Sequence, residues 1–156
     1  MKRPLQAIQT AIDRFRKMKS NIHKLEYRVI YGDTDRAGVM YYGTYMRLFE
    51  SGRTEFIRSR WGISYRQLEE QGIILPVAEL YARYRAPARY DDLLIIETTL
   101  MDITRVTISF EYKIKLAGSD TILAEGHTKH AATDSRGRVG RIPADILDAG
   151  RQILQT

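Results

Sequence analysis

Two aspartates, Asp33 and Asp35, stand one residue apart directly after the apolar run Val29-Ile30-Tyr31. A turn at Gly38 follows them, and a helical pattern begins a few residues later. A carboxylate can attack an acyl carbon or take a proton from water, and the free N–H groups at a helix N-terminus can hold negative charge on an oxygen. These residue types and their spacing therefore indicate a hydrolytic site where a strand meets a helix.

Two other classes of site also begin with an Asp-x-Asp pair, and both lack a residue they need here. A calcium loop of the EF-hand type requires an oxygen ligand where this chain has Ala37 and an acid where it has Thr44. A phosphotransferase of the haloacid-dehalogenase type has threonine at the position of Ala37. On spacing alone Asp35 is either a catalytic acid or a turn residue, whereas Asp33 is expected to hold the loop together by hydrogen bonds.

Three further residues outside this loop have side chains that can do chemistry. Glu50 lies in the helical stretch, and we interpret it as a surface acid paired with Arg47 or Arg53, with a catalytic role as the alternative. His127 and His130 fall on opposite faces of a predicted strand and have no further ligands nearby in the sequence. We therefore expect no metal site.

The residues around the two aspartates predict a strand followed by a long helix. Lys24–Tyr31 alternates between apolar and polar residues, as a strand does. From Thr44 to Arg60 apolar residues recur at helical spacing, and Gly62 marks the end of this helix. A short helix is expected over Ser64–Gly72. The apolar side of the long helix consists of Tyr45, Leu48, Phe49, Gly52, Phe56 and Ile57.

Strands are predicted to dominate the rest of the chain. Val106–Leu116 alternates strictly and so predicts an antiparallel strand with one buried and one wet face. Further strands are expected over residues 73–84, 93–102 and 122–134, the last rich in small residues that leave room for a close neighbour, and a terminal helix over 143–155. The long helix and the sheet each have one apolar side, so we expect an α+β domain in which the antiparallel sheet wraps around a central helix.

Composition narrows the class of protein and its partners. With 156 residues, 44% of them hydrophobic, the chain is long enough for one domain with its own core. It has no cysteine, which excludes disulfides and thiolate metal sites and fits a cytoplasmic location. A net charge of +6 favours anionic partners. No run of 18 apolar residues is present.

Residues 1–23 are interpreted as a basic amphipathic extension, separate from a domain over residues 24–156. Apolar residues recur there at helical spacing among many cations. Such a helix can form a tail, pack on its own oligomer, or contact a membrane surface or a partner. These alternatives stay open. The apolar residues are Leu5, Ile8, Ile12 and Phe15.

The stretch from Tyr31 to Tyr45, YGDTDRAGVMYYGTY, resembles the hotdog-fold acyl-CoA thioesterases. The most similar branch unites the 4-hydroxybenzoyl-CoA thioesterases with the Tol–Pal-associated acyl-CoA thioesterases. A second recurrent segment of that family is matched by Ala88–Thr98, ARYDDLLIIET. The resemblance extends from about Leu25 to Ile146 and implies the hotdog fold and the hydrolysis of an acyl-CoA to free acid and CoA.

The resemblance also implies roles for individual residues. The second aspartate of the pair, Asp35, would be catalytic, as nucleophile or as general base, and Tyr42 would offer its backbone N–H to the thioester carbonyl. The Tol–Pal-associated branch usually has histidine at the position of Tyr42, whereas the hydroxybenzoyl-CoA branch has tyrosine. Substrate contacts are expected at Arg105, which would meet the CoA phosphates, and at Gly38 and Tyr41.

The resemblance further implies a homo-oligomer, a dimer or a tetramer, with its sites at the subunit boundary. We expect no cofactor, no metal and no nucleic-acid partner. Contact with an acyl carrier protein, or with a membrane surface through the N-terminal extension, is a further expectation. The alternative function is a hotdog protein that binds acyl-CoA or acyl carrier protein without hydrolysing the thioester.

Overall fold

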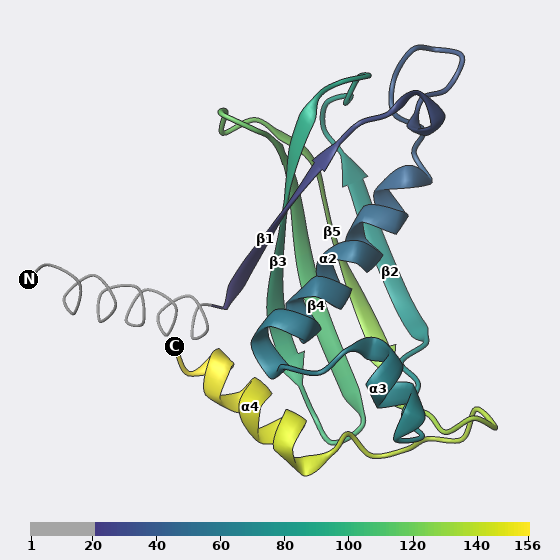
Figure 1. The fold of residues 1–156 in the computed structure, drawn as a ribbon, viewed down its shortest axis with the longest axis vertical. Coiled ribbons are helices and arrows are strands. Elements are labelled where there is room, and N and C mark those ends of the chain that lie inside the picture. Colours follow the sequence, from purple (N-terminus) through teal and green to yellow (C-terminus); the bar gives the residue numbers. More distant parts are fainter. Residues whose placement is uncertain (1–20) are drawn as a thin grey trace, which may run out of the picture.

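A computed structural model describes residues 21–156, and the predicted N-terminal basic helix lies outside this range. One antiparallel sheet of five strands, in the order β1-β3-β4-β5-β2, packs against the long helix α2 (Figure 1). This is the predicted α+β hotdog architecture. The elements are β1 (Ile22–Arg28), the 3-10 turn η1 (Tyr31–Asp33), α2 (Thr44–Trp61), α3 (Tyr65–Glu70), β2 (Val77–Tyr84), β3 (Leu93–Ile103), β4 (Thr107–Leu116), β5 (Ile122–Ala131) and α4 (Ala144–Leu154).

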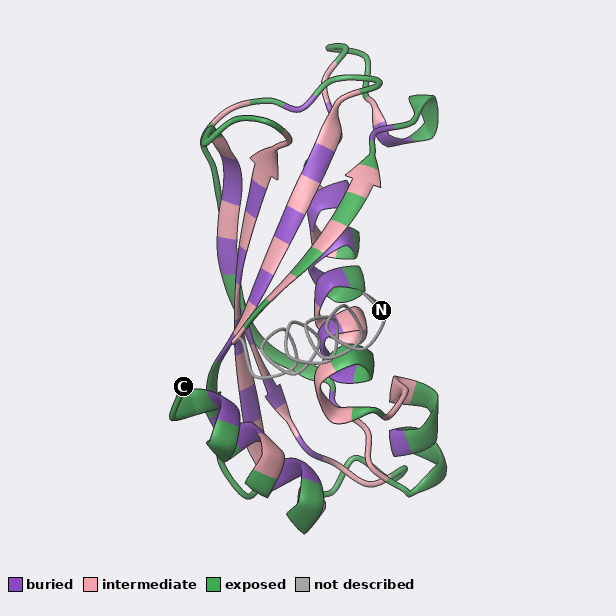
Figure 2. Cartoon of the chain, turned by 60° about the vertical axis from the view of Figure 1, so that its left-hand side comes forward, coloured by how far each residue is buried: buried purple, intermediate pink, exposed green. Residues whose placement is uncertain are grey.

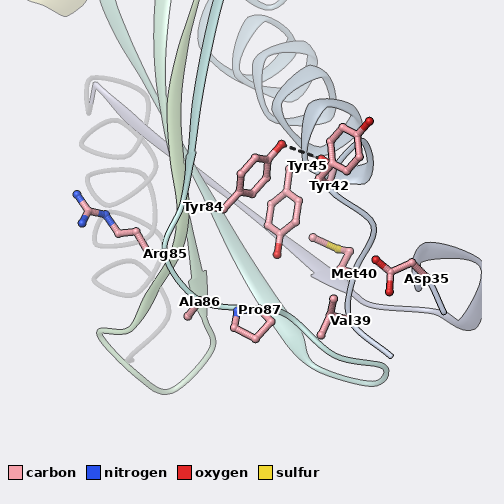
Figure 3. A pocket seen from close by; sticks show the side chains of 9 residues that line it. All are labelled: Asp35, Val39, Met40, Tyr42, Tyr45, Tyr84, Arg85, Ala86 and Pro87. Atoms are coloured by element: carbon pink, nitrogen blue, oxygen red, sulfur yellow. Dashed lines mark hydrogen bonds between the residues drawn. The ribbon is translucent and has the colours of Figure 1, made fainter. Parts of the chain in front are cut away.

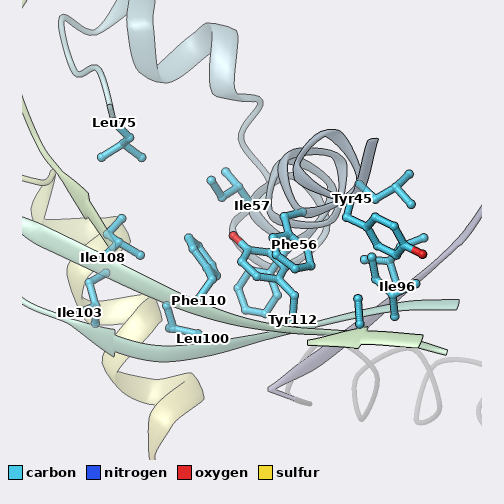
Figure 4. Packing of buried hydrophobic residues seen from close by; sticks show 14 of the residues in the cluster. Tyr45, Phe56, Ile57, Leu75, Ile96, Leu100, Ile103, Ile108, Phe110 and Tyr112 are labelled. Atoms are coloured by element: carbon cyan, nitrogen blue, oxygen red, sulfur yellow. The ribbon is translucent and has the colours of Figure 1, made fainter. Parts of the chain in front are cut away.

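The long helix α2 forms where the apolar spacing predicts it. It ends at Gly62, whose left-handed backbone (φ 66°) is one that residues with a side chain rarely adopt. Its whole predicted apolar side is buried. Figure 4 shows this side packed on the sheet, where Phe49 stacks on Tyr112 with ring centroids 4.4 Å apart and Phe56 meets Phe110 edge-on. Aromatic packing of this kind fixes how α2 lies on the sheet.

Two glycines let backbone and rings approach closely at the centre of the core. A Cβ on Gly52 of α2 would lie 2.4 Å from Thr98 Oγ1 of β3. A Cβ on Gly126 of β5 would lie 2.3 Å from the carbonyl oxygen of Tyr81 and 2.8 Å from the ring of Phe49. These contacts confirm that the small residues of the fifth strand accommodate a close neighbour.

The strands agree with the sequence predictions in place and in alternation. Buried and less buried residues alternate along β3, β4 and β5, as Figure 2 shows. Two strands are exceptions. β2 begins at Val77 rather than at residue 73, and its burial does not alternate. β1 runs from Ile22 to Arg28 rather than from Lys24 to Tyr31, so its first two residues fall within the predicted extension. The following residues turn into η1. A side chain in the loop holds this turn, as described below.

The two shorter helices close the lower end of the molecule in Figure 1. Ser64 and Gln67 form a reciprocal capping box at the start of α3. α4 packs on β3, where a Cβ on Gly150 would lie 2.8 Å from Ile103. Within residues 21–156, no helix is both long enough and apolar enough to span a membrane.

A chain of hydrogen-bonded polar side chains crosses the core between β4, β5 and the segment before β2. The hydroxyls of Tyr112 and Thr128 are 2.7 Å apart, and Thr128 Oγ1 is 2.8 Å from His130 Nε2. His130 Nδ1 donates to the Leu75 carbonyl at 3.0 Å, because a carbonyl can only accept. When the imidazole is neutral, Nε2 carries no proton and accepts from the Thr128 hydroxyl. Burial lowers the pKa of His130 to about 4, in keeping with this state.

Candidate active site

Asp33 holds together the loop that leads into α2. Its side chain is buried, and Oδ2 accepts hydrogen bonds from the Tyr27 hydroxyl at 2.7 Å and from the Ile30 N–H at 3.0 Å. The bond from the Ile30 N–H, together with the turn bond from the Asp33 N–H to the Ile30 carbonyl at 3.0 Å, holds the chain in η1 directly after the strand. Asp33 is thus the structural residue that the sequence predicts.

Asp35 lies two residues further on in a different environment. Its side chain is exposed, and Oδ1 accepts one hydrogen bond, from the Ala37 N–H at 2.8 Å. The backbone of Asp35 is bonded to Val39 and to Gly38, whose φ of 75° makes the tight turn. Its second carboxyl oxygen makes no hydrogen bond to any residue of 21–156. The acid is therefore fixed in place with one oxygen available for chemistry.

The backbone of Tyr42 presents a free donor at the start of α2. The carbonyl of Tyr41 accepts from the Thr44 N–H at 2.9 Å and so points towards the helix. Because that peptide bond is trans and planar, the N–H of Tyr42 points the opposite way, out from the helix end. It makes no hydrogen bond within the described part of the chain. The positive end of the helix dipole adds to its ability to hold negative charge.

Asp35 and Tyr42 line the same cavity, of about 330 Å³ (Figure 3). The rest of its wall comes from the loop before α2, from the helix itself, and from the end of β2 with the residues after it. These are Val39, Met40, Tyr45, Tyr84, Arg85, Ala86 and Pro87. Most of these side chains are apolar, so the cavity suits an acyl group near the acid and the free N–H.

Two tyrosines tie the walls of this cavity to each other. Tyr45 Oη accepts from the Ala88 N–H at 3.3 Å, and its ring meets Tyr84 edge-on at 5.1 Å. Tyr84 Oη in turn donates to the Tyr42 carbonyl at 3.0 Å. Burial raises the pKa of both tyrosine hydroxyls above the ordinary value, so both keep their proton at neutral pH.

The other predicted substrate residues do not line the cavity of this chain. Gly38 and Tyr41 belong to the same loop but are outside the lining. Arg105 lies in the turn between β3 and β4, at the far end of the sheet, about 35 Å away along a strand of this length. A role for Arg105 on the CoA phosphates stays a prediction, and it requires a second chain to bring this arginine to the site.

Two remaining expectations can be compared with the structure. Glu50 is exposed as predicted, but the predicted ion pair with Arg47 or Arg53 is wrong, because none forms within residues 21–156. Arg47 is exposed, where pairing contributes little, whereas Arg53 is half-buried and lies close to the Tyr112 hydroxyl. His127 and His130 lie on opposite faces of β5, one exposed and one buried.

The wall formed by residues 84–87 is the part of the site that sequence reasoning missed as a functional element. These residues directly precede the second segment that resembles the thioesterases, and that position was the available signal. Arg85 lines the cavity, but its guanidinium is directed away from the other lining side chains in Figure 3 and pairs with Glu125. The antiparallel pairing of β2 with β5 places residues 84–87 next to the start of α2.

Comparisons with known proteins agree with the fold. Residues 29–150 match the model of the thioesterase-like superfamily. The chain is 35% identical to the acyl-CoA thioesterase YbgC of Haemophilus influenzae over 75% of this chain and 85% of that one. It is 31% identical to the acyl-CoA thioester hydrolase YbgC of Escherichia coli O6:H1, over 75% and 86%. The structure of the DHNA-CoA thioesterase from Staphylococcus aureus superimposes with a TM-score of 0.80 at 26% identity, covering 86% of this chain and 91% of that one. The chain therefore belongs to the thioesterase-like superfamily and has the hotdog fold.

Proposed function

We propose that this thioester hydrolase cleaves acyl-CoA, with Asp35 acting on the carbonyl carbon and the Tyr42 N–H holding the carbonyl oxygen. The observation that supports this most is that a fixed, exposed carboxyl and an unpaired helix-end N–H line one cavity. Asp35 acts either by direct attack, which gives a mixed anhydride, or as a general base on water. The names of the relatives support the acyl-CoA substrate.

The Tyr42 N–H contributes through charge that develops during the reaction. Attack on the thioester carbon moves electrons onto the carbonyl oxygen, and a donor already aimed at that oxygen stabilises the transition state more than the substrate. One such donor is worth about 3–4 kcal/mol in other hydrolases. A backbone donor needs no particular side chain, which agrees with the tyrosine and histidine found at this position in related branches.

We further propose that the active form is a homo-oligomer, a dimer or a tetramer, in the cytoplasm. The edge strand β2 supports this, because apolar side chains project from it into solvent: Val77, Leu80, Tyr81 and Tyr84 are each 46–49% exposed. An uncovered edge with such residues favours pairing with another chain. Light scattering coupled to size-exclusion chromatography measures the mass, and a monomer at micromolar concentration would contradict this part of the proposal.

A screen for free thiol tests the proposed activity. Purified full-length chain is mixed with short-chain, long-chain and aromatic acyl-CoA thioesters, and released CoA is followed with a thiol reagent. The chain with Asp35→Asn, purified in the same way, reports hydrolysis by contaminants. We expect turnover of at least one class by the natural chain alone. Tight binding of CoA esters without thiol release would instead favour the non-hydrolytic function.

A further inference from the structure

The hydroxyl of Tyr84 contacts the backbone of the residue that carries the proposed oxyanion donor. Tyr84 is the last residue of β2, and its Oη donates to the carbonyl oxygen of Tyr42 at 3.0 Å, drawn as a dashed line in Figure 3. This bond joins the edge strand to the residue before the N-cap of α2, 42 positions away in sequence. Together with the edge-on contact between Tyr84 and Tyr45, this hydrogen bond links the two walls of the cavity.

Hydrogen bonds hold Tyr42 on both sides. The peptide before it is fixed because the Tyr41 carbonyl accepts from the Thr44 N–H at 2.9 Å. The peptide after it is fixed because its carbonyl accepts from Tyr84. Gly43, which follows, has little steric restriction of its own. The Tyr42 N–H belongs to the first of these peptides, and the bond from Tyr84 adds a second restraint on its direction from the other side of the Tyr42 Cα.

We propose that Tyr84 is a positioning residue for thioester hydrolysis, which aims the Tyr42 N–H by holding the Tyr42 carbonyl. This inference rests on the proposed function. The hydroxyl acts through the backbone of Tyr42 and does not touch the reacting atoms. Its proton is retained at neutral pH, since burial and the nearby Tyr42 ring raise its pKa, so Tyr84 is a donor throughout the working range.

If the Tyr84 hydroxyl only stabilised the fold, its removal would lower the melting temperature and leave kcat unchanged. Tyr84 is 46% exposed, so a hydroxyl freed from Tyr42 can bond to water, and the loss of this bond has little effect on folding. Small errors in the direction of a catalytic donor, in contrast, reduce turnover strongly. Removing the hydroxyl should therefore affect the chemical step far more than the melting temperature.

The first test compares Tyr84→Phe with Tyr81→Phe. Tyr84→Phe keeps the ring that meets Tyr45 and lines the cavity, and it removes only the donor. Tyr81 lies on the same strand, and its ring stacks on His127 rather than facing the cavity, so it is the matched control. We expect kcat to fall about tenfold in Tyr84→Phe with KM within twofold, and both constants to be unchanged in Tyr81→Phe. An unchanged kcat, or a rise in KM alone, would overturn the proposal.

A second variant replaces the lost donor. Incorporation of p-aminophenylalanine at position 84 puts an N–H donor at the place of the hydroxyl, and we expect it to recover most of the lost kcat. In parallel, the carbonyl carbon of Tyr42 should change its NMR chemical shift in Tyr84→Phe and return towards its original value in the rescued chain. If the shift changes while kcat does not, the bond exists but has no role in catalysis. If the natural chain releases no thiol, the proposed function fails instead.

Discussion

The hydrogen-bonded chain that crosses the core differs from the cavity in how its polar groups are paired. In the core, the side chains of Tyr112, Thr128 and His130 are bonded in sequence and end on the Leu75 carbonyl, so that each donor meets an acceptor. At the cavity, one oxygen of Asp35 and the N–H of Tyr42 are left without a partner in the described chain, although both are fixed by neighbouring hydrogen bonds.

This difference separates groups that stabilise the fold from groups that remain available to a substrate. Asp33 and Asp35, which are two residues apart in the sequence, show this difference. Asp33 is buried and accepts two hydrogen bonds with one oxygen, whereas Asp35 is exposed and accepts one. Because unsatisfied polar groups are costly only when they are buried, an open cavity can keep such groups at little cost in stability.

The largest effect is expected from Asp35→Asn. Asparagine keeps an oxygen for the Ala37 N–H and removes the charge needed for attack or proton transfer. We expect kcat to fall about 1000-fold, about 4 kcal/mol in activation free energy, while the urea midpoint stays unchanged. Asp120→Asn, in the turn between β4 and β5, is the control and should keep full activity. A loss below tenfold in Asp35→Asn would remove Asp35 from the mechanism.

The next largest effect concerns stability in acid. The pKa of His130 is lowered to about 4 in the fold, whereas an unfolded histidine titrates near 6.5. Unfolding therefore binds a proton below pH 6.5, and the stabilising effect of the neutral imidazole is complete above that pH and is lost as the pH falls towards 4. The expected loss between pH 7 and pH 4 is about 3 kcal/mol.

Urea unfolding at several pH values measures this loss. His130→Gln keeps an amide that can both donate and accept but does not titrate, so the difference in slope between the two chains isolates the histidine. Arg53, on α2, adds to the cost of a charged imidazole. Equal pH dependence in the natural chain and in His130→Gln would show that the imidazole does not control acid stability.

A smaller loss is expected from Asp33→Ala. It leaves the Tyr27 hydroxyl and the Ile30 N–H without their acceptor, and we expect the free energy of unfolding to fall by about 2 kcal/mol. Tyr27→Phe removes one of these donors together with its need for a partner, so its effect should be about half as large. If Asp33→Ala were as stable as the natural chain, the proposed role of Asp33 in holding the η1 turn would be wrong.

The smallest effect is expected from Tyr42→Phe. The proposed contribution of Tyr42 is its backbone N–H, and the side chain is 63% exposed. Turnover should stay within about twofold of the natural chain. A large loss in a folded Tyr42→Phe, measured by the same thiol release, would show that the phenol hydroxyl takes part in the reaction.

The fold could be predicted from sequence because its signals are local. The apolar side of α2, the stop at Gly62 and the alternation of β4 all lie within single elements. The structural role of Asp33 could also be predicted. The end of β1 at Arg28 could not, because the chain turns there into η1, and the hydrogen bond from Ile30 that holds this turn goes to a side chain three residues later.

Only one side of the cavity could be predicted from the sequence, because the other side is brought to it by contacts between distant parts of the chain. Asp35 and Tyr42 are close in sequence and can be recognised as a pair. Tyr84 reaches them only through the pairing of β2 with β5 and the packing of α2 on the sheet. The expected ion pair of Glu50 failed because spacing on a helix allows a contact without requiring it, and Arg53 lies close to the Tyr112 hydroxyl instead.

The most direct test of the account is a crystal structure with an acyl-CoA analogue in which a methylene group replaces the thioester sulfur. Such a ketone keeps the carbonyl but cannot be hydrolysed. We predict that its oxygen lies about 3 Å from the Tyr42 backbone nitrogen, with the Asp35 carboxyl facing the carbonyl carbon directly or through one water. A carbonyl bound elsewhere, or an Asp35 turned away from it, would contradict the proposed mechanism.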